Sequence, residues 1–303
     1  MDSSGDLFRR LEQLNAIGAA LSKERDINRL LESILIAAKT ITHADGGTLY
    51  RLSEDGRSLR FEILRNDSLH IAMGGTSGIP ISFPDLPLHD SQGAPNDSLV
   101  AAYAAIHQQT VNIVDAYTEA NFDFSGTRQF DERTGYRSKS FLAVPMKNHE
   151  GEIIGVLQLL NAQRPGGTEV TAFSLSDQSL AESLASQAAI ALSNRLLMTQ
   201  LEELFEAFIN LINLAIDEKS HYTGGHCQRV PELTLALAQS ACECKEGHLA
   251  DFDLSDDEWE ALHIAAWMHD CGKVTTPEAI VDKATNWKRY ITVFMRSALA
   301  LRC

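Results

Sequence analysis

The chain has 303 residues, of which 44% are hydrophobic and 22% charged, which allows about two globular domains and excludes a disordered or collagen-like composition. Its 26 basic and 41 acidic side chains give a formal net charge of -15, which disfavours a nucleic-acid-binding role through phosphate contacts. The sequence has neither a signal-peptide pattern nor a run of about 18 apolar residues, so we expect no membrane association and a cytoplasmic protein.

The chain begins with two helical patterns and a predicted hairpin. Residues 6–22 carry Leu7, Leu11, Leu14 and Leu21 at helical spacing, with Gly18 in the missing place of the stripe, as in an amphipathic helix. A second helical pattern covers 27–41. Two strand-like segments, 48–52 and 59–64, flank an Asp-Gly turn at 55–56. We expect these two strands to pair.

A region rich in helix and strand breakers follows. Residues 73–95 contain eight glycines and prolines, which predicts a long loop of the kind that often serves function. After it we expect a short helix near 98–108 and a strand at 111–114. The segments 140–146 and 152–161 predict a second hairpin, which brings the expected number of strands to about five.

A long helix is predicted next, because residues 168–223 contain neither glycine nor proline. Its residues follow alternating steps of four and three, which predicts a heptad seam and a parallel homodimer through residues 190–215 or so. The single Asn on this seam is of the type that fixes coiled-coil register. An amphipathic helix that lies on its own domain is the alternative. The seam positions are Ile190, Asn194, Leu197, Leu201, Leu204, Phe208, Leu211 and Ala215.

The C-terminal part is predicted to be helical and to carry polar side chains at a helix end. Residues 255–258 form a capping-box pattern that opens a helix leading to His269 and Asp270. Adjacent helical side chains diverge by about 100 degrees, so these two reach one cation only at a helix end or bend, where Gly272 gives freedom. Lys273 is spaced to face the same way and hold a phosphate oxygen. From spacing alone, a hydrogen-bonded histidine at a helix end is the more common outcome.

The amino-acid sequences of two longer segments support a metal site here. Residues 217–230 (DEKSHYTGGHCQRV) and 265–283 (AAWMHDCGKVTTPEAIVDK) resemble the HD superfamily of metal-dependent phosphohydrolases, in particular its HD-GYP branch. The resemblance implies hydrolysis of a phosphodiester, usually cyclic di-GMP, by a water molecule activated by two or three iron or manganese ions. Such cations lower the pKa of bound water and neutralise phosphate charge.

The resemblance also implies roles for individual residues. His226, His269 and Asp270 match metal ligands, and Asp270 matches the carboxylate that bridges two metals. Lys273 matches a phosphate contact, and with Asp270 it forms the expected catalytic pair. Arg229 is a second candidate for the phosphate, with a surface salt bridge as its alternative.

The match to the HD-GYP branch is incomplete. Further histidine and aspartate ligands and a Gly-Tyr-Pro segment follow the lysine motif in that family, whereas no histidine follows His269 here. Residues 284–303 contain four basic and no acidic residues, which suggests a truncated or frame-shifted end. We therefore expect impaired hydrolysis. The alternative function is a non-catalytic ligand-sensing and dimerisation module with a remnant HD segment.

The N-terminal half resembles a GAF domain. The order of elements and the segments Val114-Asp115-Ala116-Tyr117, Thr134-Gly135-Tyr136-Arg137, Val144-Pro145 and 155–161 (GVLQLLN) are similar to cyclic-nucleotide-binding GAF domains of phosphodiesterases and cyclases, over residues 20–195 or so. These domains carry an N-K...F-x-x-x-D-E signature. Asn161, Phe173 and Asp177 match it, whereas Ala162 and Gln178 replace the lysine and the glutamate.

Loss of that lysine removes the pairing of lysine with aspartate in the family. The resemblance still implies a small-molecule ligand, a cyclic nucleotide or another compound. Phe122, Phe124, Phe130 and Thr134 are candidates to line its pocket, where aromatic rings stack on a purine. Burial in the core is the common alternative for such rings.

Together these features predict an α+β protein with signalling function. We expect a GAF-type antiparallel sheet with flanking helices, a long connecting helix and a partial all-α HD domain. The expected segments are an N-terminal helix (1–24), a GAF sensor domain (25–195), a connecting helix (196–220, continuing from about 176), a partial HD domain (221–283) and an atypical tail (284–303).

Overall fold

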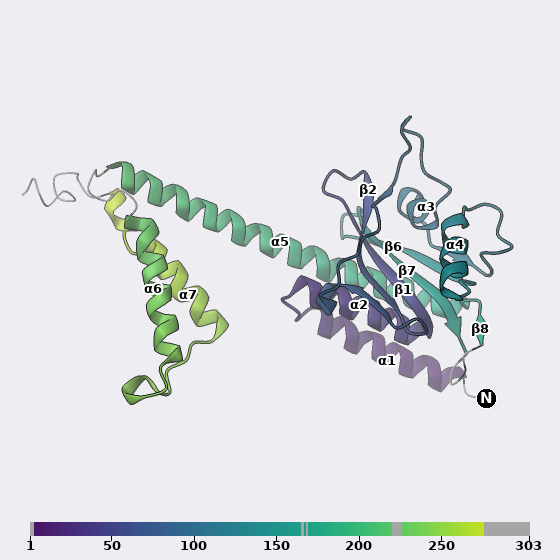
Figure 1. Ribbon diagram of the computed structural model, residues 1–303, viewed down its shortest axis with the longest axis horizontal. Helices are drawn as coiled ribbons and strands as arrows, with labels where there is room; N and C mark the ends of the chain where they lie inside the picture. The colour runs from purple at the N-terminus through teal and green to yellow at the C-terminus, as the bar shows by residue number, and fades with distance from the viewer. Residues whose placement is uncertain (1–2, 165–166, 168, 220–225, 276–303) are drawn as a thin grey trace, which may run out of the picture. The chain divides into compact units, whose positions relative to one another are not determined.

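The computed structural model describes residues 3–164, 167, 169–219 and 226–275. The chain divides into two units, Met1–Met198 and Thr199–Cys303, which we describe one at a time (Figure 1). Within the described residues, no helix is both long enough and apolar enough to cross a membrane.

The first unit is built on an antiparallel sheet with the strand order β3-β2-β1-β7-β6-β5, to which β4 adds beside β2 and β8 beside β7. Both predicted hairpins are present, as β1 with β2 and β6 with β7. The expected number of about five strands is too low, because β3, β4 and β8 are short strands. The strands are β1 (Ala44–Leu52), β2 (Ser58–Asn66), β3 (Ile71–Gly74), β4 (Leu86–Pro87), β5 (Val111–Ile113), β6 (Phe141–Lys147), β7 (Ile153–Gln163) and β8 (Val170–Thr171).

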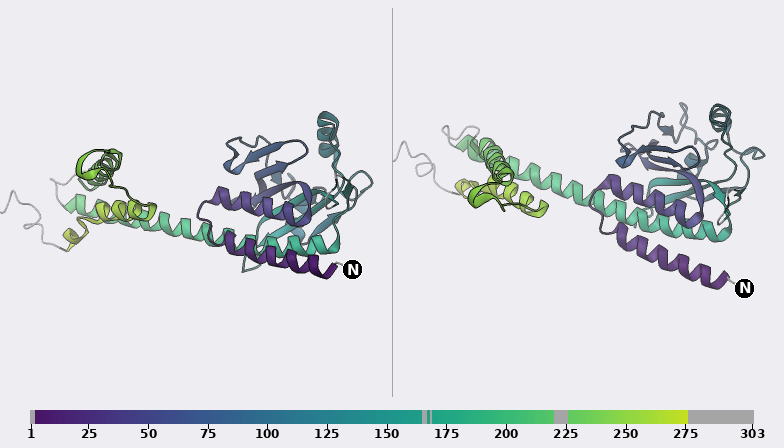
Figure 2. Two further views of the ribbon diagram at one scale, coloured as in Figure 1. Left: turned by 90° about the horizontal axis from the view of Figure 1, so that it is seen from below. Right: turned by 60° about the horizontal axis from the view of Figure 1, so that its bottom comes forward.

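Helices cover both faces of this sheet (Figures 1 and 2). On one face lie α1 (Ser3–Leu21), α2 (Ile27–Thr42) and the first part of α5 (Leu175–Lys219). The other face carries α3 (Val100–His107) and the segment that leads through α4 (Ser125–Thr134). A separate hydrophobic core fills each side, so the sheet acts as the wall between two cores.

Helix α2 shows why the first core forms where it does. Asp26 caps its N-terminus by accepting a hydrogen bond from the Arg29 N–H, 2.8 Å away. The helix ends at His43, whose left-handed backbone has a φ of 53°. Between these ends, apolar residues at helical spacing are buried against the sheet: Leu30, Leu31, Ile34, Leu35, Ala38 and Ile41.

Helix α3 approaches the opposite face closely because its buried side chains are small. Ala101, Ala102, Ala104 and Ala105 are all buried, together with Val100 at its start. The predicted helix at 98–108 is therefore present, shortened to 100–107.

Helix α5 is the predicted long helix and has 45 residues. Ser174 caps its N-terminus, since the Ser174 Oγ accepts a hydrogen bond from the Asp177 N–H, and Asp177 Oδ2 accepts in return from the Ser174 N–H and hydroxyl. Its first part packs on the sheet face that also carries α1 and α2. The buried residues are Leu180, Ala181, Leu184, Ala185, Ala188, Ala189 and Leu192.

The second unit contains the C-terminal part of α5 and two helices that pack on each other, α6 (His226–Glu243) and α7 (Asp256–Met268). The predicted capping box is present, because Glu258 accepts hydrogen bonds from the Ser255 N–H and hydroxyl. Three short 3-10 helices complete the described elements of the chain: η1 (Gly75–Ser77), η2 (Gly247–Leu249) and η3 (Cys271–Val274).

Candidate functional site

Two polar side chains lie in the middle of the sheet face that α3 covers. Thr48 on β1 pairs with Gln158 on β7, which pairs with Ala143 on β6. Cross-strand partners share a face, and Ala143 belongs to the core under α3. Thr48 is 8% exposed and Gln158 is half-buried. The surrounding core is apolar, so these two groups stand out as possible contacts for a bound molecule.

Tyr50, two residues after Thr48 in β1, adds a third polar side chain on the same face. Burial raises the pKa of the Tyr50 phenol. The ring also packs on Phe61, with centroids 4.7 Å apart. Tyr50 is therefore a neutral hydroxyl at any physiological pH.

The predicted aromatic residues lie on the segment that crosses this face. Phe124 is buried against Phe141, with ring centroids 5.1 Å apart. Phe122 is half-buried and meets Tyr103 of α3 edge-on at 5.3 Å. Phe130 is half-buried on α4. Thr134 is exposed at the end of α4, where its hydroxyl donates to the Phe130 carbonyl. Their assignment to ligand binding stays a prediction.

Asp131 connects the two ends of this segment by hydrogen bonds. The carboxylate is 3% exposed and accepts hydrogen bonds from the Tyr117 hydroxyl at 2.7 Å and from the N–H and hydroxyl of Ser138 at 2.7 and 2.8 Å. Its hydrogen bond raises the pKa of the Tyr117 phenol. The guanidinium of Arg137 lies over the Tyr117 ring, 4.8 Å from the centroid. Asp131 thus joins both ends of the α4 segment.

Asn161 fixes the same segment to the sheet. It has a φ of 54° in β7, a conformation that Asn adopts more readily than most residues. Its amide donates to the Arg137 carbonyl at 2.8 Å and accepts from the N–H groups of Lys139 and Ser140 at 2.7 and 3.3 Å. The first residue of the GAF signature therefore holds the chain between α4 and β6.

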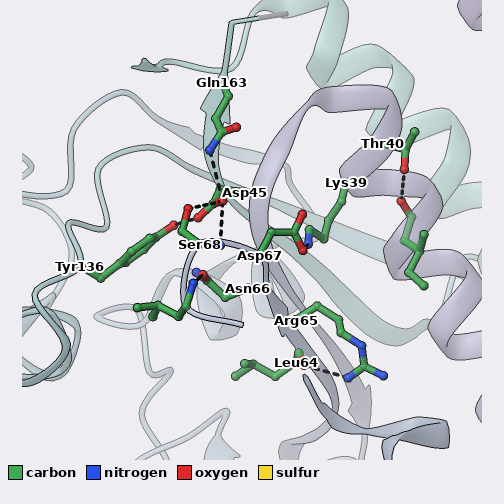
Figure 3. Close-up of polar contacts among 12 residues, drawn as sticks. Lys39, Thr40, Asp45, Leu64, Arg65, Asn66, Asp67, Ser68, Tyr136 and Gln163 are labelled. Carbon is green, nitrogen blue, oxygen red and sulfur yellow. Dashed lines mark hydrogen bonds and ion pairs between the residues drawn. The ribbon is translucent and has the colours of Figure 1, made fainter. Parts of the chain in front are cut away.

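Asp45 holds the segment at a third point (Figure 3). This buried carboxylate accepts hydrogen bonds from the hydroxyls of Tyr136 and Ser68 and from the Gln163 amide, the last two at 2.7 and 3.2 Å. Burial and the bond to Asp45 raise the pKa of the Tyr136 phenol. Beside this group the Lys39 ammonium pairs with Asp67 at 2.5 Å.

The rest of the signature supports the start of α5. Phe173 is buried in the core that contains residues of α1, α2 and α5, and Asp177 pairs with Ser174 in the capping box at the start of α5. Gln178, in place of the glutamate, accepts a hydrogen bond from the Asn112 amide of β5 at 3.1 Å. Ala162, in place of the lysine, is buried, and its N–H donates to the Ser140 hydroxyl. The enclosed sheet face and the start of α5 are thus connected by hydrogen bonds.

In the second unit, His269 and Asp270 lie together at the end of α7. Nδ1 of His269 is 2.7 Å from the Ala266 carbonyl oxygen, which can only accept, so this nitrogen carries the proton. Nε2 then faces the Asp270 carboxylate, 3.3 Å from Oδ2. A carbonyl behind Nδ1 is the usual support of a metal-binding histidine.

The remaining predicted ligands are not placed. The side chains of His226 and Lys273 lie outside the described residues, and Arg229 is exposed near the start of α6. Among the side chains that are described, no three His, Cys, Asp or Glu residues converge in a way that could hold a metal ion. The convergence of His226 with His269 and Asp270 stays a prediction.

The fold, together with the sheet face over which Asp45, Asp131 and Asn161 hold the α4 segment, matches one class of sensor domain. The GAF domain model matches residues 26–192, more than half of the chain, so the protein belongs to the GAF domain family. The resemblance seen in the sequence is confirmed for this domain. No comparison shows an HD domain after it.

Curated relatives support this assignment. The chain is 25% identical over 228 residues to the dual 3',5'-cyclic-AMP and -GMP phosphodiesterase 11A of Takifugu rubripes, covering 74% of this chain and 23% of that protein. It is 28% identical over 151 residues to the cGMP-specific 3',5'-cyclic phosphodiesterase of Drosophila erecta, covering 48% and 12%. The chain thus spans less than a quarter of the length of these relatives.

Among solved structures, the chain is similar to the GAF domain of an Acinetobacter phosphoenolpyruvate-protein phosphotransferase, with a TM-score of 0.46, 16% identity, and coverage of 63% of this chain and 98% of that chain.

Proposed function

We propose that this protein is a signal-transduction protein in which the GAF domain binds a small molecule between the sheet and the α4 segment and controls an HD-type metal-dependent phosphohydrolase through α5. The observation that carries the sensing half is the Thr48 and Gln158 pair on an otherwise apolar, enclosed face. Hydroxyl and amide groups recognise the polar edge of a ligand whose apolar part the core covers.

A purine compound is the ligand class we favour. Gln158 offers an amide that both donates and accepts, as the edge of a base requires, and half-buried aromatic rings line the segment above it. The relatives named as cyclic-nucleotide phosphodiesterases point to the same class. Cyclic AMP and cyclic GMP are therefore the first compounds to test.

The test is isothermal titration of the full chain with cyclic AMP and cyclic GMP. We expect one of them to bind, and Gln158→Leu to weaken that binding by at least tenfold. Gln129→Leu, an exposed glutamine on α4, is the matched control and should bind as the unchanged chain does. Equal affinity of both variants would contradict this location for the site.

The output half rests on the His269 and Asp270 pair. Both side chains fit a divalent metal, iron or manganese in the related family, with His226 as the third ligand by resemblance. A bound metal supplies an activated water for attack on a phosphodiester such as cyclic di-GMP. By the same resemblance, Lys273 and Arg229 would hold phosphate oxygens.

With only three of the family's ligands, we expect this chain to bind metal weakly and to hydrolyse poorly. Metal analysis after incubation with manganese should show bound ion that His269→Ala or Asp270→Ala removes, and the exposed His248→Ala leaves unchanged. Steady hydrolysis of cyclic di-GMP by the purified chain would contradict the expected impairment. A chain that binds ligand but no metal would favour the alternative, a non-catalytic sensing module with a remnant HD segment.

A further inference from the structure

A second cavity lies at the C-terminal end of α2, apart from the sheet face under α3. Its volume of about 740 Å³ is in the range of small-molecule sites. Ile36, Lys39 and Thr40 of α2 form one wall, and Arg65 of β2 and Gln163 of β7 lie near the ends of their strands. Helix α2 covers the sheet face opposite α3, so this cavity is not part of the ligand site proposed above.

Basic side chains gather around this cavity although the chain as a whole is acidic. The chain has 26 Lys and Arg residues against 41 Asp and Glu residues. Among the described residues that line the cavity, Lys39, Arg65 and Arg164 are basic and Asp67 alone is acidic. His43 adds an imidazole, which also accepts a positive charge. Such a local excess of positive charge favours an anionic ligand.

Lys39 is the buried cation of this group (Figure 3). The residue is 7% exposed, and its ammonium lies 2.5 Å from Asp67 Oδ1. A buried ammonium requires an anionic partner, because removing an unpaired charge from water is costly. The Asp67 side chain, in contrast, is 75% exposed. Water competes for this carboxylate, so an anion from solution can take its place beside Lys39.

The two arginines supply further donors. Arg65 is held in place, since its guanidinium donates to Glu32 at 2.6 Å and to two backbone carbonyls at 3.0 and 2.9 Å. These bonds use three of its five N–H donors. Arg164 is exposed and pairs with the exposed Glu169 at 3.0 Å. A surface pair of this kind constrains the arginine weakly, which leaves it able to turn toward a ligand.

We propose that this cavity binds a small molecule that carries a phosphate monoester. The phosphate replaces the Asp67 carboxylate beside Lys39, and its remaining oxygens accept from the arginine guanidiniums, whose planar fork matches a phosphate group. The cavity is larger than a phosphate ion requires, and the exposed side chain of Ile36 offers an apolar surface to the organic part of the ligand. This site depends neither on the ligand of the sheet face nor on the output of the second unit.

Isothermal titration of the full chain tests the proposal in a phosphate-free buffer of low ionic strength. Inorganic phosphate and ribose 5-phosphate are the probes. We expect both to bind, and ribose 5-phosphate to bind more tightly. Succinate, a dicarboxylate, should bind about tenfold more weakly than ribose 5-phosphate. Absence of binding by both phosphate probes would overturn the proposal, and succinate binding as tightly as ribose 5-phosphate would overturn the choice of a phosphate ligand.

Variants locate the binding. Arg164→Gln should weaken ribose 5-phosphate binding by about threefold to tenfold, whereas Arg57→Gln, a matched exposed arginine in the turn between β1 and β2, should leave it unchanged. Lys39→Met keeps the apolar stem and should weaken binding by more than about tenfold, with circular dichroism to check folding. Asp67→Asn should tighten binding by about threefold, because the ligand no longer competes with a carboxylate. Unchanged affinity in both Arg164→Gln and Asp67→Asn would overturn the site, whatever Lys39→Met does to folding.

Two controls separate this site from other sources of phosphate binding. Gln158→Leu alters the sheet face and should leave ribose 5-phosphate binding unchanged; a loss as large as that of the cyclic nucleotide would place both ligands in one site and overturn the proposal. Flotation with vesicles that contain phosphatidic acid tests for a lipid phosphate. We expect the chain to remain in the soluble fraction. Flotation that Arg164→Gln abolishes would assign the site to a lipid headgroup and overturn a soluble ligand.

Discussion

Replacing Asn161 tests whether the first residue of the GAF signature is a clamp for the α4 segment. Asn161→Ala removes the amide that bonds the Arg137 carbonyl and the Lys139 N–H. Asn161 is itself 1% exposed, so both partners lose a hydrogen bond to a buried side chain. Each unsatisfied backbone group costs about 1–3 kcal/mol. Alanine at a φ of 54° adds about 1 kcal/mol.

The expected loss for Asn161→Ala is therefore about 3–7 kcal/mol of unfolding free energy. Asn161→Gly removes the same hydrogen bonds but tolerates positive φ, so it should cost about 1 kcal/mol less than alanine. The difference between the two variants isolates the backbone contribution, and what remains is the contribution of the clamp.

Urea unfolding followed by far-ultraviolet circular dichroism measures both variants, and hydrogen exchange of residues 137–140 locates the effect. The three tryptophans are Trp259, Trp267 and Trp287, so tryptophan fluorescence follows the C-terminal part and serves as an internal control. Its transition should not move. An Asn161→Ala variant within about 0.5 kcal/mol of the unchanged chain would refute the reasoning.

Three further predictions follow from contacts in the first unit. The pKa of Tyr136 in the folded protein lies above the unfolded value of 10.0, so the stability that this phenol contributes is present below pH 10 and is lost as the pH rises further. Tyr136→Phe should therefore flatten the decline in the urea midpoint between pH 9 and about 11. An unchanged slope would contradict this. Gly155→Ala should destabilise by about 3 kcal/mol in thermal unfolding, because its Cβ would lie 2.2 Å from the Tyr50 carbonyl oxygen, whereas Gly126→Ala on α4 meets open space and should be neutral or stabilising by up to ~1 kcal/mol. Asp131→Ala should increase hydrogen exchange in residues 117–138, while Asp123→Ala, an exposed neighbour, should alter exchange only near its own turn.

Local patterns made much of the fold predictable. The two hairpins, α2, the uninterrupted α5 and the capping box at Ser255 each arise from residues close in the sequence, so their patterns are visible without the structure. The short strands β3, β4 and β8 were missed because each is held by pairing with a distant strand rather than by its own composition. Tertiary pairing decides such segments.

The site was predictable only in part for the same reason. Asn161 was singled out by the signature, but its role depends on a left-handed conformation and on a segment more than twenty residues away. Asp45, Thr48 and Asp131 were not singled out. One signal for Thr48 was present, a polar residue within a strand of otherwise buried character, but its facing partner Gln158 becomes known only once the strand register is known.

Because β1 lies at the centre of the sheet, it takes part in both cores at once. Leu49 points into the core shared with α2 and α5, whereas Thr48 and Tyr50 point into the core under α3. On the ligand site proposed above, a displacement of β1 at Thr48 would also displace Leu49, which packs in the core that contains α2 and the first part of α5. Because alternate residues of β1 belong to the two cores, the backbone of this strand is a direct mechanical connection between them.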